Sequence, residues 1–184
     1  MSELRTNKIY PRNGLPVSAS GGGIIQVVSV TKTDVENLTS TGTETLIPGM
    51  EATITPQSTS NKILVMITLS VMTGASFAGH YAVLRRNSTN ICRGDAAGSR
   101  FRATLNLGAP HTYDNDQGIY GPGYVSMTHL DSPGVANSAV TYGIYHADVA
   151  GTENELYINR GGNDNDSTSY ARTASSITLM EVSG

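Results

Sequence analysis

The sequence predicts an all-β protein: an antiparallel β-sandwich or jelly roll preceded by an extended N-terminal arm. Three observations lead to this prediction. The composition is poor in the residues that fill helix surfaces, one long run is apolar and β-branched, and short alternating segments recur between turns rich in Gly, Pro, Asn and Ser. Such a series of short strands is typical of sandwiches and jelly rolls.

Composition sets the size of the core and the fold class. The chain has 184 residues, of which 38% are hydrophobic, enough for one domain with a substantial core. Only 15% are charged, Gly occurs 20 times, and Trp is absent. Helix surfaces normally carry Glu, Lys, Arg and Gln, so this composition favours few long helices.

The run from Ser60 to Met72, SNKILVMITLSVM, is the predicted central strand. One face is apolar at every second position, which predicts burial in the core: Ile63, Val65, Ile67, Leu69 and Val71. On the other face Leu64 and Met66 are apolar, whereas Thr68 and Ser70 are polar. We therefore expect one end of this second face to be covered, by another subunit or by a loop of the same chain, and the other end to meet water.

Residues 1 to 23 form a first unit, distinct from the β domain at residues 24 to 184. Apolar side chains are widely spaced there, Pro11 and Pro16 interrupt the segment, and the glycines at 21 to 23 close it as a hinge. A piece of this kind cannot bury a core of its own. It is expected to be a disordered tail or an extended arm that docks on another surface, with docking favoured.

The remaining strands are predicted from alternation and bounding turns, at residues 24–33, 50–55, 80–87, 101–107, 124–130, 138–147, 155–160 and 175–182. In the strand at 138–147, Tyr142 lies on one face and Tyr145 on the other. Aromatic side chains on both faces predict that both are covered.

Residues 93 to 123 are the least periodic part of the chain and are expected to be long loops, which are usually functional or packed at an interface. Nine Tyr against two Phe favour surface recognition, because Tyr offers an apolar ring and a hydroxyl together. The candidate recognition residues are Tyr113, Asp114, Asp116, Tyr120 and Tyr124. Packing of these rings between subunits is the alternative. Arg93-Gly94-Asp95 spells a short adhesion tripeptide, for which a turn is a sufficient explanation.

The sequence shows no pattern of reaction chemistry. Four histidines lie far apart without metal-binding spacing, and no nucleophile elbow, P-loop or Cys-His arrangement is present: the histidines are His80, His111, His129 and His146. Asp114, Asp116, Asp131 and Asp148 could converge as glycosidase carboxylates, but their turn-like contexts favour bonds to the local backbone. We expect a non-enzymatic protein without a cofactor.

The segment Asn163 to Asp166 alternates oxygen-bearing side chains in a way similar to a calcium loop. It lacks the Gly and the distal bidentate Glu of an EF-hand, so a solvated hairpin tip is the better interpretation.

Charge and cysteine content limit the partners and the compartment. The net charge is −3 and the basic residues are scattered, so neither nucleic acid nor membrane insertion is expected. Cys92 is the single cysteine, which rules out an intramolecular disulfide and fits a chain folded in a reducing cytoplasm. The segment MSELRTNKIYPRNG has no apolar run that could serve as a signal peptide.

Several patterns in order along residues 20 to 184 resemble a group of tailed-bacteriophage virion proteins, tail-fibre-like and common in marine and cyanobacterial phages. These patterns are SGGGIIQVV, ITPQSTSNKILVMITL, GDAAGSR, LDSPG with VTYGIYHA, LYINR, and the terminal SSITLMEV. The opening SELRTNKIYPRNG is similar to segments by which short fibre or decoration proteins attach to the particle. The resemblance implies a docking role for Leu4, Lys8, Ile9 and Tyr10.

The resemblance also implies a homotrimer of jelly rolls, made in the host cytoplasm and carried on the virion. The candidate subunit interface is Leu64, Met66, Tyr142 and Tyr145. The expected function is a short fibre-type protein, held by its arm to other virion proteins and displaying a β domain for attachment. The chain has no repeat-bearing shaft or long coiled coil, so a capsid decoration protein that stabilises the head is the alternative. A module that binds or depolymerises host surface glycans is a further alternative.

Overall fold

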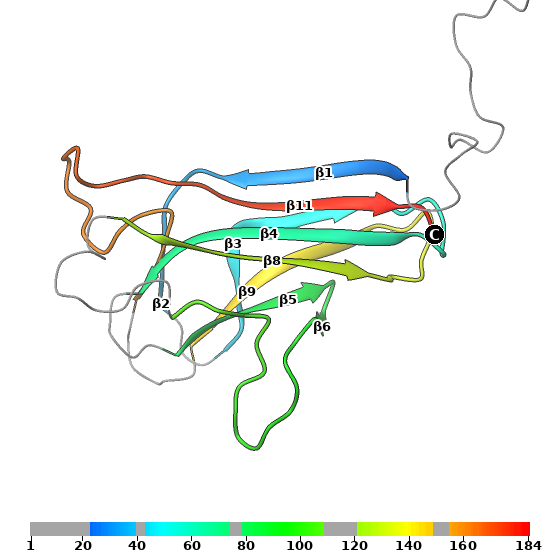
Figure 1. Ribbon diagram of the computed structural model, residues 1–184, viewed down its shortest axis with the longest axis horizontal. Helices are drawn as coiled ribbons and strands as arrows, with labels where there is room; N and C mark the ends of the chain where they lie inside the picture. The colour runs from blue at the N-terminus through cyan, green and yellow to red at the C-terminus, as the bar shows by residue number, and fades with distance from the viewer. Residues whose placement is uncertain (1–22, 40–42, 74–78, 109–120, 149–154) are drawn as a thin grey trace, which may run out of the picture.

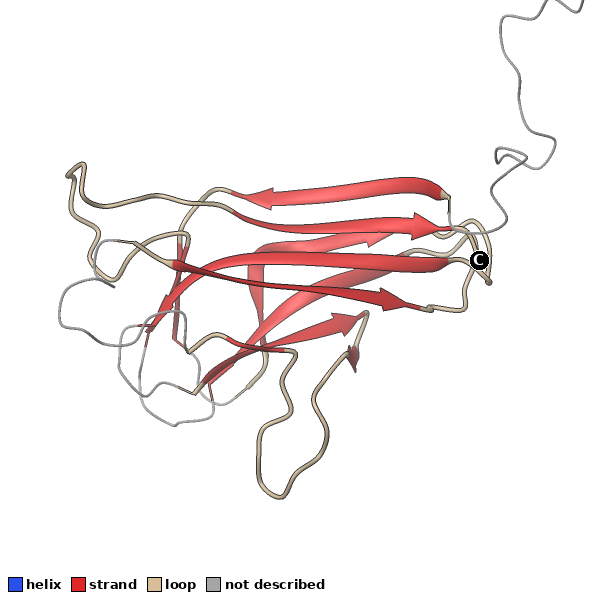
Figure 2. Cartoon of the chain, viewed as in Figure 1, coloured by secondary structure: helices blue, strands red, loops and turns tan. Residues whose placement is uncertain are grey.

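In the computed structural model the chain forms two antiparallel β-sheets packed face to face, a β-sandwich (Figures 1 and 2). The structure describes residues 23–39, 43–73, 79–108, 121–148 and 155–184, and these contain no helix. The predicted all-β sandwich is confirmed. The predicted arm lies outside the described residues except for Gly23.

The first sheet, sheet A, is built around the predicted central strand. Its strands follow the order β1-β11-β4-β10-β2, and β8 pairs with the other edge of β4. Strand β11 pairs with the first part of β4 and β10 with its last part, along the same edge. In the next position out, β1 pairs with β11 and β2 pairs with β10. The bounds are β1 (Ile24–Lys32), β2 (Glu36–Thr39), β4 (Lys62–Thr73), β8 (Gly123–Asp131), β10 (Glu155–Ile158) and β11 (Ser175–Val182).

The second sheet, sheet B, has the order β3-β9-β5-β6, and β7 pairs with β5 beyond the end of β6. The bounds are β3 (Thr45–Ile54), β5 (His80–Arg86), β6 (Thr89–Ile91), β7 (Leu105–Asn106) and β9 (Val140–Asp148). All pairings in both sheets are antiparallel.

The core lies between the sheets and follows the period-two pattern of the sequence. The apolar stripe of β4 is buried as predicted, with every member at most 2% exposed. Inward side chains of sheet B pack opposite it, among them Ile54, Leu84 and Ile144. Burial of apolar side chains of this size stabilises the fold by about 1.5–3 kcal/mol each.

Strand boundaries differ from the prediction mainly in β3, which begins at Thr45 and not at residue 50. Its pairing with β9 shifts between Leu46 and Glu51, and in this bulge Ile47 and Met50 both turn into the core. Gly49 allows the turn because it takes a φ of 76°, which other residues adopt only with strain. The short strand β2 was not predicted, and the strand predicted at 101–107 is reduced to β7.

One end of the second face of β4 is covered, as predicted, and it is the polar end around Ser70. Ser70 is fully buried, whereas Met66 is 41% exposed and Leu64 is half-buried. The cover is the connection from Asn159 to Ala174, which leaves the sheet between β10 and β11; the Ser70 hydroxyl bonds the Thr173 hydroxyl at 2.7 Å. A loop of the same chain therefore covers the polar end, and the apolar end is left open.

A buried asparagine, Asn159, connects the end of β1, the start of β11 and the segment between β1 and β2. The Asn159 side-chain amide donates to the carbonyl oxygens of Lys32 and Asp34, both at 2.9 Å, and its oxygen accepts from the Ser175 hydroxyl at 2.7 Å. Asn159 is fully buried and has a φ of 62°. This one side chain ties three segments that are distant in the sequence.

Candidate functional site

The outer face of sheet A carries the exposed large hydrophobic side chains of the described structure. We call it the A face and define it by the outward side chains of β1, β11, β4 and β8. It comprises Ile24, Val27, Ser29, Thr31, Ser176, Thr178, Met180, Val182, Lys62, Leu64, Met66, Thr68, Tyr124, Ser126, Thr128 and Leu130. Lys62 is the only charged residue of this set. β1, β11, β4 and β8 lie side by side in Figure 1, so the set is continuous across the sheet.

The apolar side chains of the A face align in one row across all four strands. Val27 pairs with Met180, Met180 with Leu64, and Leu64 with Leu130. Val27 is 53% exposed and Leu130 48%. All the exposed large hydrophobic residues of the described structure lie on the A face: Ile24, Val27, Met66, Tyr124 and Leu130. Exposed apolar patches that are concentrated in this way mark interaction sites.

The next rows of the A face are hydroxyl-bearing rather than charged. The Ser29 and Thr178 hydroxyls bond one another at 2.8 Å, and Met66 lies beside Thr178 and Thr128. Hydroxyls that already pair with one another cost little to remove from water. This pair can therefore be buried against a partner surface at a lower desolvation cost than unpaired hydroxyls.

The four predicted interface residues do not form one surface. Leu64 and Met66 lie on the A face, but Tyr145 lies on the outer face of sheet B, where the Arg85 guanidinium stacks on its ring at 4.0 Å. Tyr142 lies between the sheets and is fully buried. The prediction for Tyr142 is wrong, because its alternation with Ile144 places it in the core of its own subunit.

Tyr142 is part of a buried polar cluster at one end of the sandwich. Its hydroxyl donates to Asp131 at 2.6 Å, and Arg86 donates to both oxygens of the same carboxylate at 2.9 and 3.0 Å. Burial and the Asp131 carboxylate raise the pKa of Tyr142 above its ordinary value. The phenol is therefore protonated at neutral pH and donates to the Asp131 carboxylate.

Tyr142→Phe is expected to lower the free energy of unfolding by about 1–2 kcal/mol, because it removes one donor from a buried carboxylate that Arg86 still satisfies. Urea unfolding measures the change. Tyr145→Phe is the matched control, since its ring lies on the outer face of sheet B, and a change within about 0.5 kcal/mol is expected there. An equal loss in both variants would contradict the assigned role of the Tyr142 hydroxyl.

Of the predicted recognition residues, the structure describes Tyr124 alone. Tyr124 is 57% exposed, pairs with Ser70 and belongs to the A face rather than to a loop. Tyr113, Asp114, Asp116 and Tyr120 lie outside the described residues, as do Leu4, Lys8, Ile9 and Tyr10 of the arm.

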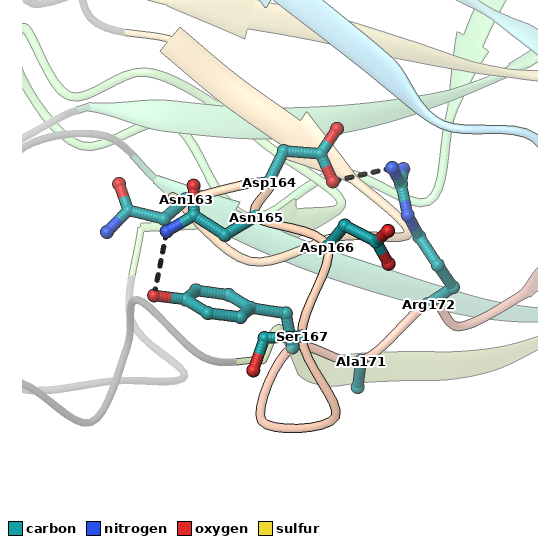
Figure 3. A pocket seen from close by; sticks show the side chains of 8 residues that line it. Asn163, Asp164, Asn165, Asp166, Ser167, Ala171 and Arg172 are labelled. Atoms are coloured by element: carbon teal, nitrogen blue, oxygen red, sulfur yellow. Dashed lines mark hydrogen bonds and ion pairs between the residues drawn. The ribbon is translucent and has the colours of Figure 1, made fainter.

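The segment from Asn163 to Arg172 encloses an open polar pocket of about 300 Å³ (Figure 3). Asp164 pairs with Arg172 at 2.5 Å, and Asn165 donates to the Tyr170 hydroxyl at 3.2 Å. A cation bound by Asp164 would have to displace the guanidinium, so the local charge disfavours a calcium site. The segment is exposed, as expected, but β10 and β11 pair with β4 and not with each other, so it is a connecting loop and not the tip of a strand hairpin.

The carboxylates considered as glycosidase groups do not converge where they are described. Asp131 lies beside Arg86 at the C-terminal end of β5, whereas Asp148 pairs with His80 at the N-terminal end of that strand. Asp131, on β8 of sheet A, and Asp148, on β9 of sheet B, therefore lie near opposite ends of β5. Asp114 and Asp116 fall outside the described residues.

A pair of buried histidines was missed in the sequence. His80 Nδ1 lies 2.8 Å from His146 Nε2, and the residues are 0% and 1% exposed. Burial lowers the pKa of His80, against the opposing effect of Asp148; burial and then His80 lower that of His146 to about 4. The sequence did contain a signal for this pair. His80 lies on the same strand face as Ala82 and Leu84, and His146 lies on the same face as Ile144; these apolar residues all point into the core.

No protein-family model matches the chain, and no curated protein matches it significantly. The resemblance to virion proteins therefore stays a prediction. Among the described residues, no helix is long and apolar enough to cross a membrane, and no group of three or more His, Cys, Asp or Glu is arranged to hold a metal ion.

Proposed function

We propose that this chain is a non-enzymatic structural protein of a bacteriophage particle, a short fibre-type protein that assembles as a homotrimer through the A face. The A face supports the proposal, because it gathers the exposed large hydrophobic side chains of the described structure on a sheet with one charged residue. Interface cores are depleted in charge in the same way. The N-terminal arm then attaches each subunit to the particle.

We further propose that the sandwich is a jelly roll. The order β1-β11-β4-β8 in one sheet and β3-β9-β5-β6 in the other places strands from the two ends of the chain side by side in both sheets. This is the arrangement that two intertwined Greek keys produce, and it is common in virus capsid proteins. It supports a structural role only by analogy of fold.

Three linked subunits would explain why weak attachment by each arm is sufficient. Once one arm of a trimer is bound, the other two act at a high effective concentration. Gly23, the last residue of the predicted arm, lies next to the end of β11: its carbonyl accepts from the Ser183 amide, and its amide donates to the Ser183 hydroxyl. The arm is therefore joined to the sandwich beside Ile24 of the A face.

The oligomer is tested by Met66→Glu in the full chain, with mass in solution as the measurement. We expect a trimer for the unchanged protein and a monomer for the variant, because burial of an unpaired carboxylate costs about 3 kcal/mol or more per subunit. Thr53→Glu adds the same charge to an exposed strand position of sheet B and is expected to leave the trimer intact. A monomeric unchanged protein, or a variant of unchanged mass, would overturn the assembly.

The particle role is tested separately with phage particles that lack the protein. The full chain is expected to bind them, and a chain without residues 1 to 22 is not. Binding to isolated tails supports the fibre-type role, whereas binding to isolated heads would identify a capsid decoration protein instead. A full-length trimer that binds neither would leave the assembly standing and remove the virion role.

A further inference from the structure

The loop from Cys92 to Thr104, which we call the arginine loop, stands out from the body of the sandwich. It joins β6 to β7 at the edge of sheet B and is the green loop that projects below β6 in Figure 1. All residues from Gly94 to Arg100 are exposed. It leaves from the sheet opposite the A face, so assembly through the A face does not cover it.

Hydrogen bonds within the loop hold its shape. The Gly94 amide donates to the Ala103 carbonyl at 3.0 Å, and Arg102 Nε donates to the Gly94 carbonyl at 2.7 Å. Gly98, with a φ of 61°, makes the turn at the tip, and Phe101 stacks on Tyr81 of β5 at 5.2 Å. A loop already held in one shape loses little conformational freedom on binding.

The described arginines divide into two groups. Four lie outside the loop, and each has a charge or ring partner: Arg85 pairs with Glu44, Arg86 with Asp131 and Arg172 with Asp164, while Arg160 stacks on Tyr157. The other three are Arg93, Arg100 and Arg102, and none of them forms an ion pair within the described residues. Asp95 is the only carboxylate of the loop, so the loop carries a net charge of +2 (three Arg minus one Asp) on a chain of net charge −3.

We propose that the arginine loop binds an anionic polysaccharide, one that carries carboxylate or sulfate groups. Guanidinium groups match such oxygens with two parallel hydrogen bonds, and three of them on one projecting loop can contact successive sugar units. Exposed charge pairs are individually weak, so a polymer that contacts several loops is held better than a single ion. This inference rests on the proposed function in one respect: a homotrimer would display three arginine loops together, whereas a monomer displays one.

Nucleic acid is also an anionic polymer that the positive charge of the arginine loop could bind, but it fits the loop less well. Proteins that bind it through the backbone commonly neutralise about 6–10 phosphates, whereas the loop offers three arginines on an acidic chain. Duplex DNA is therefore included in the test as a competing ligand class.

The test measures binding of the full-length protein to immobilised polygalacturonate, dextran sulfate, uncharged dextran and a short DNA duplex. We expect binding to one or both anionic polysaccharides, with affinity falling as salt rises, and none to dextran. R93Q/R100Q/R102Q is expected to bind about tenfold more weakly or worse, and Asp95→Asn to bind more tightly. The triple Arg→Lys variant should retain part of the affinity, since charge remains without the bidentate geometry.

Arg172→Gln is the matched control, because it removes one exposed guanidinium elsewhere, and unchanged affinity is expected. Equal thermal unfolding of the triple glutamine variant and the unchanged protein shows that the loop change leaves the fold intact. Unaltered binding by that variant, absence of binding to both anionic polymers, or tighter binding to DNA would overturn the proposal. Met66→Glu separates the two proposals, since a monomer should still bind through its single loop, with lower avidity.

Discussion

Between pH 7 and pH 5 the free energy of unfolding is expected to fall by about 2 kcal/mol, because His146 is buried without charge next to His80. The ordinary pKa of His146 is 6.5, and in the folded protein it is lowered to about 4. The unfolded chain therefore binds a proton in this range that the folded protein does not. The contribution of His146 to the free energy of unfolding is fully present above pH 6.5 and is lost as the pH falls toward 4.

The window from pH 7 to pH 5 isolates the histidines from the carboxylates. Burial would raise the pKa of Glu181, but hydrogen bonds from Asn61, Gln26 and the Gln57 amide outweigh it and hold that pKa below its ordinary value of 4.5. Its contribution is present above that value and is lost only at lower pH. His80 and His146 are faced by one another and by Asp148.

Urea unfolding at fixed protein concentration measures this loss, since association would otherwise add to stability. His146→Gln keeps an acceptor for His80 and is expected to flatten the slope between pH 7 and pH 5. Asn137→Gln is the control, because it changes an exposed residue that does not titrate, and it should keep the slope of the unchanged protein. A slope unaffected by His146→Gln would contradict the role of the buried pair.

Asn159→Ala is expected to destabilise the protein by about 3 kcal/mol or more, because two buried hydrogen bonds and one partly buried bond are lost and a φ of 62° is imposed on alanine. The carbonyl oxygens of Lys32 and Asp34 would lose the same donor, at the point where β1 and β2 meet. Chemical unfolding of the full chain measures the effect.

Two companion variants separate backbone strain from lost hydrogen bonds. Asn159→Gly tolerates the positive φ but lacks the side chain, so it is expected to lie between the unchanged protein and Asn159→Ala. Asn137→Ala is the matched control: Asn137 is exposed, has a φ of 55°, and its replacement should cost about 1 kcal/mol from strain alone. Equal losses at positions 159 and 137 would show that the buried bonds contribute nothing.

The elements that the sequence predicted well are those whose signal is local. Alternation along β4, β9 and β11 names the buried face of each strand, because successive side chains of a strand point to opposite sides whatever the strand pairs with. The apolar side chains that β4 contributes to the A face, Leu64 and Met66, were visible for the same reason. The composition was enough to exclude a helical fold.

Other features escaped prediction because they depend on partners far away in the chain. Strand β2 is short and polar, and it exists because β10 pairs with it. The bulge of β3 depends on β9, and the His80–His146 bond joins residues 66 positions apart. No window of sequence contains both members of such a pair.

Local sequence therefore determined which residues form strands and which side of each strand is apolar, since both follow from alternation within a few residues. Only the tertiary structure decided where each face lies. It buried Tyr142 and turned Tyr145 outward, closed the connection after β10 over Ser70, and left Leu64 and Met66 open. The reason is that exposure is a property of the packed neighbours, and here those neighbours come from the other sheet or from a connection about a hundred residues away.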